Sequence, residues 1–504
     1  MDHLKKIISY ELKLETFKDS NSDGIGDFNG LLQKINYLKS LNVNVVFIDD
    51  VLKQYQNVTN VNEVNNKYGS LQDFINIVQT MQKSNIMLSP IIDLKDIKQL
   101  FLNWKNMMEL YSDSFSTTKE IEWNSLQSKY LINNIDPNNN IVDLANFILY
   151  LDKVVNFYNE CGIRCFTFKN FEILLKYDEF TKHSNLEKLE DLYKTLKRIN
   201  TNAIMILQPK SFNKQLFKNI LSYDTKYTDY LYLNLFSLIN INIELPYTKK
   251  MPLNLSKFLN EYKFAMHDKR IIMCLESDAS GKINSMWGDE KAYMNEAANS
   301  FLLTLFSGKN SIGLYSGFEL GQNRAKWIEL NNNFAKNEEK RYYESKKITK
   351  EAYFEAKKYQ SKENMEVIMS WNNTDFCGFS DYNMWKFSPA LNYYTNNVKT
   401  EQNDPNSCLN FYIFLTNFIK DKTYLDSLDK SSISVKKIND ILFIKRKYNK
   451  QTLKFIYNLT NKPKRLFPQY GNYKLITSSY VSKIYASLPK YLEPFESIII
   501  INDN

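Results

Sequence analysis

The sequence is poor in glycine, proline and histidine. Its 504 residues include 13 glycines and 11 prolines, well below the roughly 7% and 5% of an average protein. This shortage excludes collagen-like and Gly/Pro-rich low-complexity chains. The three histidines, His3, His183 and His267, lie far apart in the sequence, so we do not expect a histidine-based metal or acid–base cluster.

Long apolar runs and a strong excess of one charge are also missing. No stretch approaches roughly 18 consecutive apolar residues, and the N-terminus has no apolar segment followed by a small-residue cleavage site. We therefore expect neither a membrane span nor a secretion signal. The 65 basic and 56 acidic residues leave a net charge of +9, which is small for this length and does not by itself predict nucleic-acid binding.

The five cysteines have neither zinc-finger nor redox-motif spacing. Cys161 and Cys165 lie four residues apart, but no second pair of ligands follows them. Reduced, buried thiols are the expectation for such a pattern, and they are typical of proteins in a reducing compartment. We therefore expect a cytoplasmic protein.

Short apolar runs alternate with amphipathic stretches through most of the chain. Apolar residues recur with helical spacing at 31–41, 71–83 and 186–199. Eight predicted strands alternating with helices indicate a (β/α)8 barrel. A doubly wound sheet is the alternative, but it would normally carry a glycine-rich first turn that is missing here. The predicted strands span residues 7–12, 43–48, 86–92, 163–168, 203–207, 230–235, 270–275 and 311–315.

The pattern changes near residue 405. A predicted helix over 410–419 is followed by closely spaced apolar segments: DILFIKRKY, TLKFIYNLT, YKLITSSY and SIIIIN. Closely spaced strands without intervening helices are typical of an antiparallel sheet. We therefore predict a small all-β domain, a sandwich, at the C-terminal end.

Oxygen-bearing side chains recur at alternate positions in the segment DSNSDGIGD. They occupy relative positions 1, 3, 5 and 9, with a glycine at 6 and a backbone carbonyl available at 7, which is the order found in EF-hand-like calcium loops. We expect one structural Ca²⁺, or Mg²⁺, in this loop; an Asx-rich turn is the alternative. The expected ligands are Asp19, Asn21, Asp23, the carbonyl of Ile25, and Asp27.

The segment that contains this loop resembles a known family. FKDSNSDGIGDFNGLLQKINYLKSLNVNVVFI is similar to the first βα unit of the α-amylase superfamily, in particular to the oligo-1,6-glucosidase and trehalose-6-phosphate hydrolase branch of glycoside hydrolase family 13. Further segments resemble motifs of that branch, and the resemblance is collinear over roughly residues 5–503. These segments are KYGSLQDF (67–74), SIGLYSGFELG (311–321), MSWNNTDFCGF (369–379) and NYYTNNVKTEQNDPNSCLNFY (392–412).

The resemblance implies a domain organisation that agrees with the pattern of strands and helices. It implies an α/β fold: a (β/α)8 TIM barrel with an insertion domain after the third strand and a C-terminal antiparallel β-domain. The spacer after the third strand is short, so the insertion is reduced. On this basis the barrel comprises residues 1–94 and 136–404, the shortened insertion residues 95–135, and the C-terminal β-sandwich domain residues 405–504.

The residues that carry catalysis in this family are replaced here. The family's enzymes are retaining glycosidases, in which a nucleophilic carboxylate and a general acid flank the scissile bond. The resemblance aligns Lys169 with the nucleophile and Gln208 with the acid, and retains only the third carboxylate, Asp278. Glutamine has no titratable proton to donate, and Lys169 would repel the positive charge of the transition state. Hydrolysis by the family's mechanism is therefore not expected.

Other positions of the substrate pocket also depart from the family pattern. Thr167 stands where the family has an arginine, and Ser277 where it has the histidine that precedes Asp278. We expect Lys169 to pair with Asp278, or failing that with Asp93, because a buried cation needs a partner. The vestigial pocket positions are Asn57, Ser89, Asp93, Leu94, Thr167 and Ser277.

These substitutions predict a pseudo-glycosidase with a binding, structural or regulatory role in carbohydrate metabolism. Its partner would be a protein or a carbohydrate, and we expect no nucleic acid. The alternative is an α-glucosidase or phosphotrehalase that hydrolyses α-glucosidic bonds with non-standard residues. Glu276 and Asp278 would be the pair for an inverting version, because residues two apart on a strand share a face.

Overall fold

A computed structural model of the protein describes most of the chain. The described residues are 5–49, 51–52, 63–95, 151–177, 184–222, 227–235, 253–277, 281–326, 341, 344–345, 349–353, 359, 367–381, 387–466, 472–483 and 487–503. Asn57, Asp278 and all but the first residue of the predicted insertion lie outside them. Within these ranges no helix combines the length and the apolar character needed to cross a membrane.

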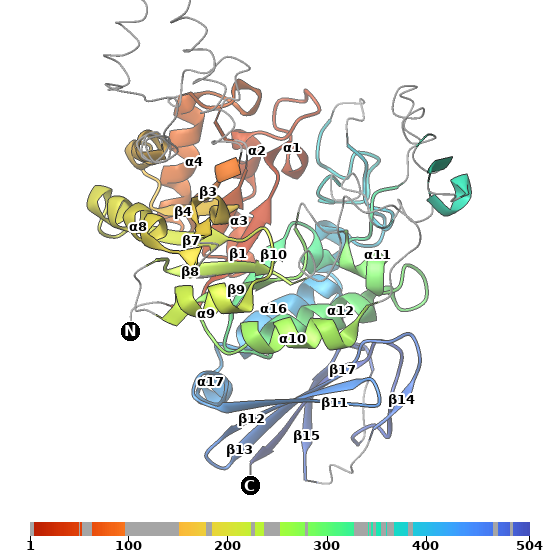
Figure 1. Ribbon diagram of the computed structural model, residues 1–504. Helices are drawn as coiled ribbons and strands as arrows, with labels where there is room; N and C mark the ends of the chain where they lie inside the picture. The colour runs from red at the N-terminus through yellow and green to blue at the C-terminus, as the bar shows by residue number, and fades with distance from the viewer. Residues whose placement is uncertain are drawn as a thin grey trace, which may run out of the picture. The chain divides into compact units, whose positions relative to one another are not determined.

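Eight strands form a closed parallel barrel, which confirms the predicted fold (Figure 1). They are β1 (Ile8–Leu12), β2 (Val45–Ile48), β3 (Met87–Asp93), β4 (Cys165–Lys169), β7 (Ile204–Gln208), β8 (Tyr230–Asn234), β9 (Ile271–Cys274) and β10 (Ser311–Tyr315). They follow one another around the barrel in chain order, and β10 pairs with β1. Each of the eight predicted strands is found, to within two residues at either end.

The barrel strands are mainly apolar because both of their faces are covered. Every residue of β1, β2, β8, β9 and β10 is buried. A parallel sheet has the barrel interior on one side and helices on the other, so its strands appear in the sequence as continuous apolar runs. The interior is tight at Gly313, where a Cβ atom would lie 3.0 Å from the Cβ of Cys274.

The helices follow the predicted segments, with one difference. Helix α4 begins with a capping box in which Ser70 and Asp73 bond to each other's backbone N–H. The predicted helix at 31–41 is two short helices that meet at Lys34, whose backbone (φ −105°, ψ 8°) is not helical. The helices are α1 (Leu14–Phe17), α2 (Phe28–Gln33), α3 (Ile35–Ser40), α4 (Leu71–Lys83), α8 (Glu187–Ile199), α9 (Lys214–Ser222), α10 (Leu255–Ala265), α11 (Ile283–Trp287), α12 (Met294–Phe306), α15 (Val398–Gln402), α16 (Cys408–Phe418) and α17 (Lys422–Asp429).

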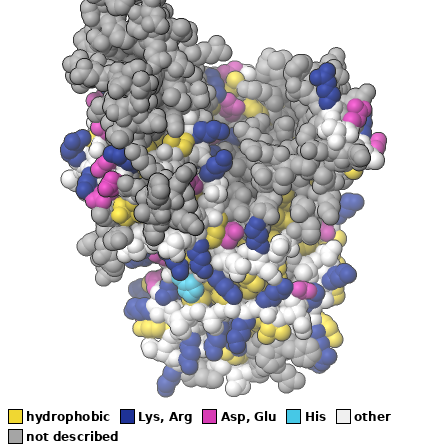
Figure 2. Space-filling model, viewed as in Figure 1, with side chains coloured by type: hydrophobic (Ala, Val, Ile, Leu, Met, Phe, Trp, Pro, Cys, Tyr) yellow, Lys and Arg dark blue, Asp and Glu magenta, His cyan; other side chains and the backbone are white. Residues whose placement is uncertain are grey.

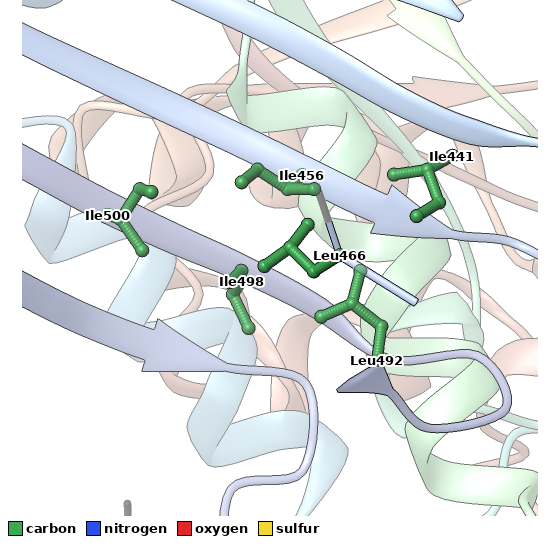
Figure 3. Packing of buried hydrophobic residues seen from close by; sticks show 6 residues of the cluster. All are labelled: Ile441, Ile456, Leu466, Leu492, Ile498 and Ile500. Carbon is green, nitrogen blue, oxygen red and sulfur yellow. The ribbon is translucent and has the colours of Figure 1, made fainter. Parts of the chain in front are cut away.

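An antiparallel β-domain follows the last helix, as predicted. Its strands are β11 (Ser432–Ile438), β12 (Ile441–Tyr448), β13 (Gln451–Asn458), β14 (Lys464–Arg465), β15 (Lys474–Ser478), β16 (Tyr491–Leu492) and β17 (Ser497–Asp503). Five of them form a sheet in the order β11-β12-β13-β17-β15, and β14 pairs with β16. Basic side chains gather over this domain in Figure 2. Its core cluster, shown in Figure 3, consists of Ile441, Ile456, Leu466, Leu492, Ile498 and Ile500.

By its internal contacts the chain divides into two compact units. One comprises residues 47–231 and contains β3, β4 and β7; the other comprises residues 2–46 and 232–504 and contains β1, β9, β10 and the C-terminal sheets. The domain boundaries expected from the sequence, at 95–135 and at 405, stay predictions.

Candidate functional site

Asp93, Lys169 and Gln208 are the last residues of three adjacent strands and form one row. The parallel register pairs Asp93 of β3 with Lys169 of β4, and Lys169 with Gln208 of β7. The carboxyl ends of the strands form the catalytic face of (β/α)8 barrels. The structure therefore brings three of the predicted site residues together at that face, where they supply one carboxylate, one cation and one amide.

The row is backed by a pair of buried hydroxyl groups. The Ser89 and Thr167 hydroxyl oxygens are 2.8 Å apart, and both side chains are buried. Since side chains alternate along a strand, Thr167 shares a face of β4 with Lys169, and Ser89 shares a face of β3 with Asp93. The two neutral hydroxyl groups are hydrogen-bonded to each other. One of them belongs to Thr167, which stands where the family resemblance implies an arginine. Leu94, the residue after β3, is also buried.

Asn170 connects the three strand ends and was not foreseen from the sequence. Its amide nitrogen donates to both carboxylate oxygens of Asp93, at 2.7 and 2.9 Å, and its backbone N–H donates to the carbonyl of Gln208 at 2.9 Å. The Asp93 carboxylate also accepts the Lys95 N–H at 2.9 Å. Its position directly after a predicted strand was the only hint in the sequence that Asn170 belongs to the site. Its contacts depend on the register between neighbouring strands, which the sequence does not specify.

Gln208 carries a buried polar atom without a partner. The side chain is 6% exposed, and its Oε1 atom forms no hydrogen bond with any described residue. A buried, unsatisfied carbonyl oxygen costs free energy of folding, and a hydroxyl donor from a ligand would satisfy it.

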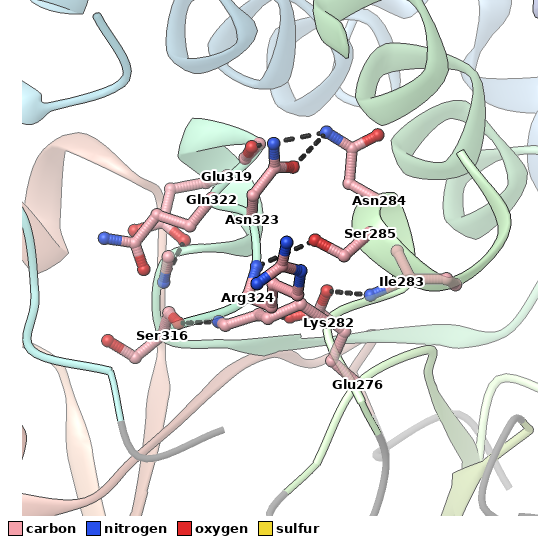
Figure 4. Close-up of polar contacts among 12 residues, drawn as sticks. Glu276, Lys282, Ile283, Asn284, Ser285, Ser316, Glu319, Gln322, Asn323 and Arg324 are labelled. Carbon is pink, nitrogen blue, oxygen red and sulfur yellow. Dashed lines mark hydrogen bonds and ion pairs between the residues drawn. The ribbon is translucent and has the colours of Figure 1, made fainter. Parts of the chain in front are cut away.

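A buried ion pair lies at the end of β9. Glu276 is fully buried; it pairs with the ammonium group of Lys282 at 3.3 Å and accepts the Ile283 N–H at 2.7 Å. Lys282 also donates to the Ser316 carbonyl at 2.9 Å (Figure 4). Burial raises the pKa of Glu276, and the Lys282 charge opposes that shift. Glu276 is thus a structural carboxylate without access to solvent. Its neighbour Ser277, at the position where the family has a histidine, is likewise buried, with 2% of its surface exposed.

Glu319, in the motif SIGLYSGFELG, is a second buried carboxylate. It accepts hydrogen bonds from the phenol groups of Tyr10 at 2.7 Å and Tyr37 at 2.6 Å, and from the Gly317 N–H at 3.0 Å. Gly317 has a positive φ of 88°, and a Cβ atom there would collide with the Gln322 side chain. The motif therefore builds a turn that packs β10 against β1, and the sequence alone did not reveal this role.

The first carboxylate of the predicted calcium loop organises the backbone around it. Asp19 accepts N–H groups from Asn21, Ser22 and Gly24 at 2.7 to 3.0 Å. It also accepts the Ser380 hydroxyl at 2.6 Å. Asp19 is only 2% exposed, so these hydrogen bonds stabilise a carboxylate that would otherwise be costly to bury.

The remaining predicted ligands also have partners within the loop. Asp27 caps α2 by accepting the Gly30 N–H at 2.6 Å, and Asp23 accepts the Ile25 N–H at 2.8 Å. Asn21 accepts the Asp23 N–H at 3.0 Å. In the described part of the chain no three His, Cys, Asp or Glu side chains are arranged to hold a metal ion. The donor types and their order fit a cation loop, and the calcium site stays a prediction.

Comparisons with known proteins extend over nearly the whole chain. The family model "Alpha amylase, catalytic domain" matches residues 14–95 and 221–427. Probable oligo-1,6-glucosidase 3 of Bacillus subtilis (strain 168) is 22% identical over 474 residues, covering 81% of this chain and 82% of that protein. Trehalose-6-phosphate hydrolase of the same organism is 20% identical over 463 residues, covering 81% of each chain. The crystal structure of Bacillus licheniformis trehalose-6-phosphate hydrolase has a TM-score of 0.77 at 16% identity and covers 99% of both chains.

The two matched ranges exceed half of the chain and contain the loop from Asp19 to Asp27 as well as Asp93. The interval between them, which the family model does not match, contains Lys169 and Gln208. The family model, the two relatives and the shared barrel all indicate the same family. On these grounds the chain belongs to the α-amylase family, glycoside hydrolase family 13.

Proposed function

We propose that this protein is a pseudo-glycosidase, an α-amylase-family protein that does not hydrolyse α-glucosidic bonds. The observation that supports the proposal is the row at the carboxyl ends of β3, β4 and β7. There the register sets Lys169 between Asp93 and Gln208. The family resemblance assigns the nucleophile to the position of Lys169 and the general acid to that of Gln208.

The charge of Lys169 is incompatible with the family's transition state. The sugar ring develops oxocarbenium-like positive charge, and a carboxylate stabilises this charge whereas an ammonium group repels it. At about 4 Å and an effective dielectric constant near 20, the exchange of attraction for repulsion amounts to roughly 8 kcal/mol, or about six decades in rate. Gln208 adds a second obstacle because its amide cannot protonate a leaving oxygen.

Hydrolysis assays test the proposal directly. Purified protein is incubated with p-nitrophenyl α-glucoside, isomaltose and trehalose 6-phosphate, alongside an active oligo-1,6-glucosidase as the positive control. We expect no turnover by the wild type. A kcat near the ~10 s⁻¹ of a typical enzyme would overturn the proposal and support the alternative, an α-glucosidase or phosphotrehalase that uses non-standard residues. The Lys169→Asp/Gln208→Glu variant tests whether restoring both carboxyl groups restores activity.

The role that we propose in place of hydrolysis is binding, structural or regulatory, within carbohydrate metabolism. The unpartnered Oε1 of buried Gln208 supports a bound sugar, because a sugar hydroxyl would satisfy it. Calorimetric titration of the wild type and of Gln208→Met with glucose and isomaltose measures whether a sugar binds and whether its binding depends on Gln208. If the wild type binds neither sugar, the unpartnered Oε1 of Gln208 is not a sugar site.

Two further features belong to the proposal. We propose a cytoplasmic location, which the five buried cysteines, all free thiols, support because thiols persist in a reducing compartment. We also propose that the loop from Asp19 to Asp27 holds a structural Ca²⁺ or Mg²⁺; its alternating oxygen donors support this.

A further inference from the structure

The net positive charge of the protein is concentrated in its C-terminal β-domain. Residues 430–504 contain 14 basic and 4 acidic residues, whereas the other 429 residues contain 51 basic and 52 acidic ones. One explanation for the charge is a general bias of the coding sequence towards lysine codons, but such a bias would enrich lysine along the whole chain. It does not explain why acidic residues balance the lysines everywhere except in this domain.

Four lysines lie on one face of the domain's main sheet, and we call this surface the lysine face: Lys436, Lys445, Lys447 and Lys454. Lys445 on β12 stands directly opposite Lys454 on β13, and Lys436 on β11 stands opposite the residue two before Lys445. Directly opposed residues, and residues two apart on a strand, point to the same side of a sheet. The four charges therefore share one surface.

Three of the four lysines of the lysine face form no ion pair with the described part of the chain. Like charges directly opposite one another destabilise a sheet, and no described carboxylate forms an ion pair with Lys436, Lys445 or Lys447, all of which are exposed. Asp440, the one acidic residue on the hairpins of β11 to β13, pairs instead with Lys437 at 3.5 Å and Lys464 at 3.2 Å. Among the charged side chains of this domain that Figure 2 shows, basic ones accordingly prevail over acidic ones.

The other end of the same face is closed by the hydrophobic core. Ile441, Ile456 and Ile500 lie on the same side of the sheet as the lysines, and they pack against Leu466 and Leu492 (Figure 3). At the lysine end Lys436, Lys445 and Lys447 are exposed, while Lys454 is half-buried with its ammonium group 4.1 Å from the centre of the Tyr473 ring. The sheet thus presents a basic surface beside a well-packed hydrophobic core.

Exposed apolar side chains accompany the basic residues of this domain. Ile438 lies on the same face of β11 as Lys436 and is 47% exposed; Tyr491, opposite Arg465 in the small sheet, is 53% exposed. Lysine combined with exposed aliphatic and aromatic side chains suits the interface of a lipid bilayer, where apolar groups enter the headgroup region and the ammonium groups remain at its surface.

We propose that the lysine face binds reversibly to membrane surfaces rich in anionic lipid. Lysine presents a hydrated point charge and lacks the planar fork with which arginine recognises single phosphates, so a row of lysines fits a diffuse negative surface. Each lysine near such a surface strengthens binding about five- to tenfold, and the effect decays within a Debye length. The lysine face belongs to the C-terminal domain, so its binding to membranes does not depend on whether the barrel hydrolyses sugars.

Vesicle co-sedimentation of the full-length protein tests the proposal. We expect the protein to sediment with vesicles that contain phosphatidylglycerol and phosphatidylcholine at about 0.1 M salt, and to be released at about 1 M salt, where the Debye length falls to about 3 Å. Pure phosphatidylcholine vesicles should not sediment it. Equal binding to both kinds of vesicle, or binding to neither, overturns the proposal.

Matched triple variants locate the binding surface. Lys436→Gln/Lys445→Gln/Lys447→Gln should weaken binding about 100-fold. The control is Lys39→Gln/Lys83→Gln/Lys399→Gln, which removes the same charge from exposed positions elsewhere and should change binding little. An equal loss in both variants would mean that total charge, not this face, decides binding. Adding RNA or duplex DNA distinguishes a nucleic-acid site: binding of the nucleic acid to the lysine face without any binding to vesicles would also refute the proposal.

Discussion

Asn170 holds the Asp93 carboxylate with a single amide nitrogen, at 2.7 and 2.9 Å from its two oxygens. Asn170 stands directly after β4 in the left-handed backbone conformation (φ 58°, ψ 37°), which asparagine tolerates better than most residues. In this conformation its own N–H reaches the Gln208 carbonyl. One side chain and one peptide group thus fix the spacing of the strand ends on either side of Lys169.

Substitution of Asn170 should therefore lower stability in two separable steps. Asn170→Gly keeps the left-handed backbone accessible and removes only the amide, so we expect a loss of about 1–3 kcal/mol for hydrogen bonds to a charged group. Asn170→Ala should cost about 1–2 kcal/mol more because alanine is strained at positive φ. Urea unfolding measures both. An alanine variant as stable as the glycine variant would show that the backbone at this residue is not held as described.

The strands of the barrel could be predicted from the sequence because each is buried on both faces. Runs such as VNVVFI and SIGLY contain few polar residues, and no other element of a soluble domain needs so short and so apolar a segment. The helix at 31–41 was predicted as one piece because its apolar spacing continues through Lys34, while the structure ends one helix and begins another there. Periodicity does not report the backbone angles of a single residue.

Which polar and charged side chains are buried, and what they contact, was harder to predict from the sequence. The segment IKRKY contains three consecutive basic residues, and only the pairing of β12 shows that Arg446 points inward. Arg446 is fully buried and donates to the Ser431 hydroxyl, to the Ser307 carbonyl at 2.9 Å and to the Leu428 carbonyl. Asn170 and Glu319 escaped notice for the same reason: their partners lie far away in the sequence.

The buried pair of Glu276 and Lys282 should be sensitive to the loss of either charge. Removing one partner leaves a buried charge without compensation, so Glu276→Leu and Lys282→Met should each destabilise the fold by about 3–5 kcal/mol. The double variant Glu276→Leu/Lys282→Met should recover most of that loss, since apolar replacement of a buried pair is often neutral. Chemical denaturation of the three variants checks this.

A surface pair provides the comparison. Glu190→Gln breaks a pair with Lys194 (2.7 Å) on α8 in which the lysine is 68% exposed, and it should cost no more than about 0.5 kcal/mol. Strictly additive losses in the Glu276→Leu/Lys282→Met variant would contradict the coupling that we infer between the two buried charges.

Glu261 on α10 should make stability depend on pH near neutrality. Burial raises its pKa from 4.5 to about 7, while Lys257 opposes the shift. Because the folded-state pKa is the higher one, the protonated form favours folding, and this contribution is lost as pH rises from 4.5 through 7. Glu261→Gln, which resembles the protonated acid, should match the wild type at about pH 4, below the unfolded-state pKa, and exceed it by about 2–3 kcal/mol at pH 8. Parallel stability curves for the two proteins across this range would contradict the assignment.

In the loop from Asp19 to Asp27, the carboxylates that could bind a cation already accept backbone hydrogen bonds. A test of the cation site must therefore separate the two contributions to stability. Two of the carboxylates also have contacts beyond the loop: Asp19 accepts the Ser380 hydroxyl, and Asp27 caps the N-terminus of α2. Their substitution would lower stability with or without a cation. Asp23 bonds only within the loop, to Ile25 and Asn21, so it separates ion binding from structural hydrogen bonding.

If the loop holds a divalent cation, Ca²⁺ should raise the melting temperature of the wild type and EDTA should lower it, because an ion that binds only the folded state stabilises that state by mass action. At a free Ca²⁺ concentration of 100 times the Kd, the gain is about 2.7 kcal/mol. Asp23→Ala should lose most of this response. Asp289→Ala, at another turn whose carboxylate accepts the Lys291 and Ala292 N–H groups at 2.6 and 2.8 Å, should retain it. A wild-type melting temperature that is the same in Ca²⁺, Mg²⁺ and EDTA would show that the Asx hydrogen bonds alone stabilise the loop.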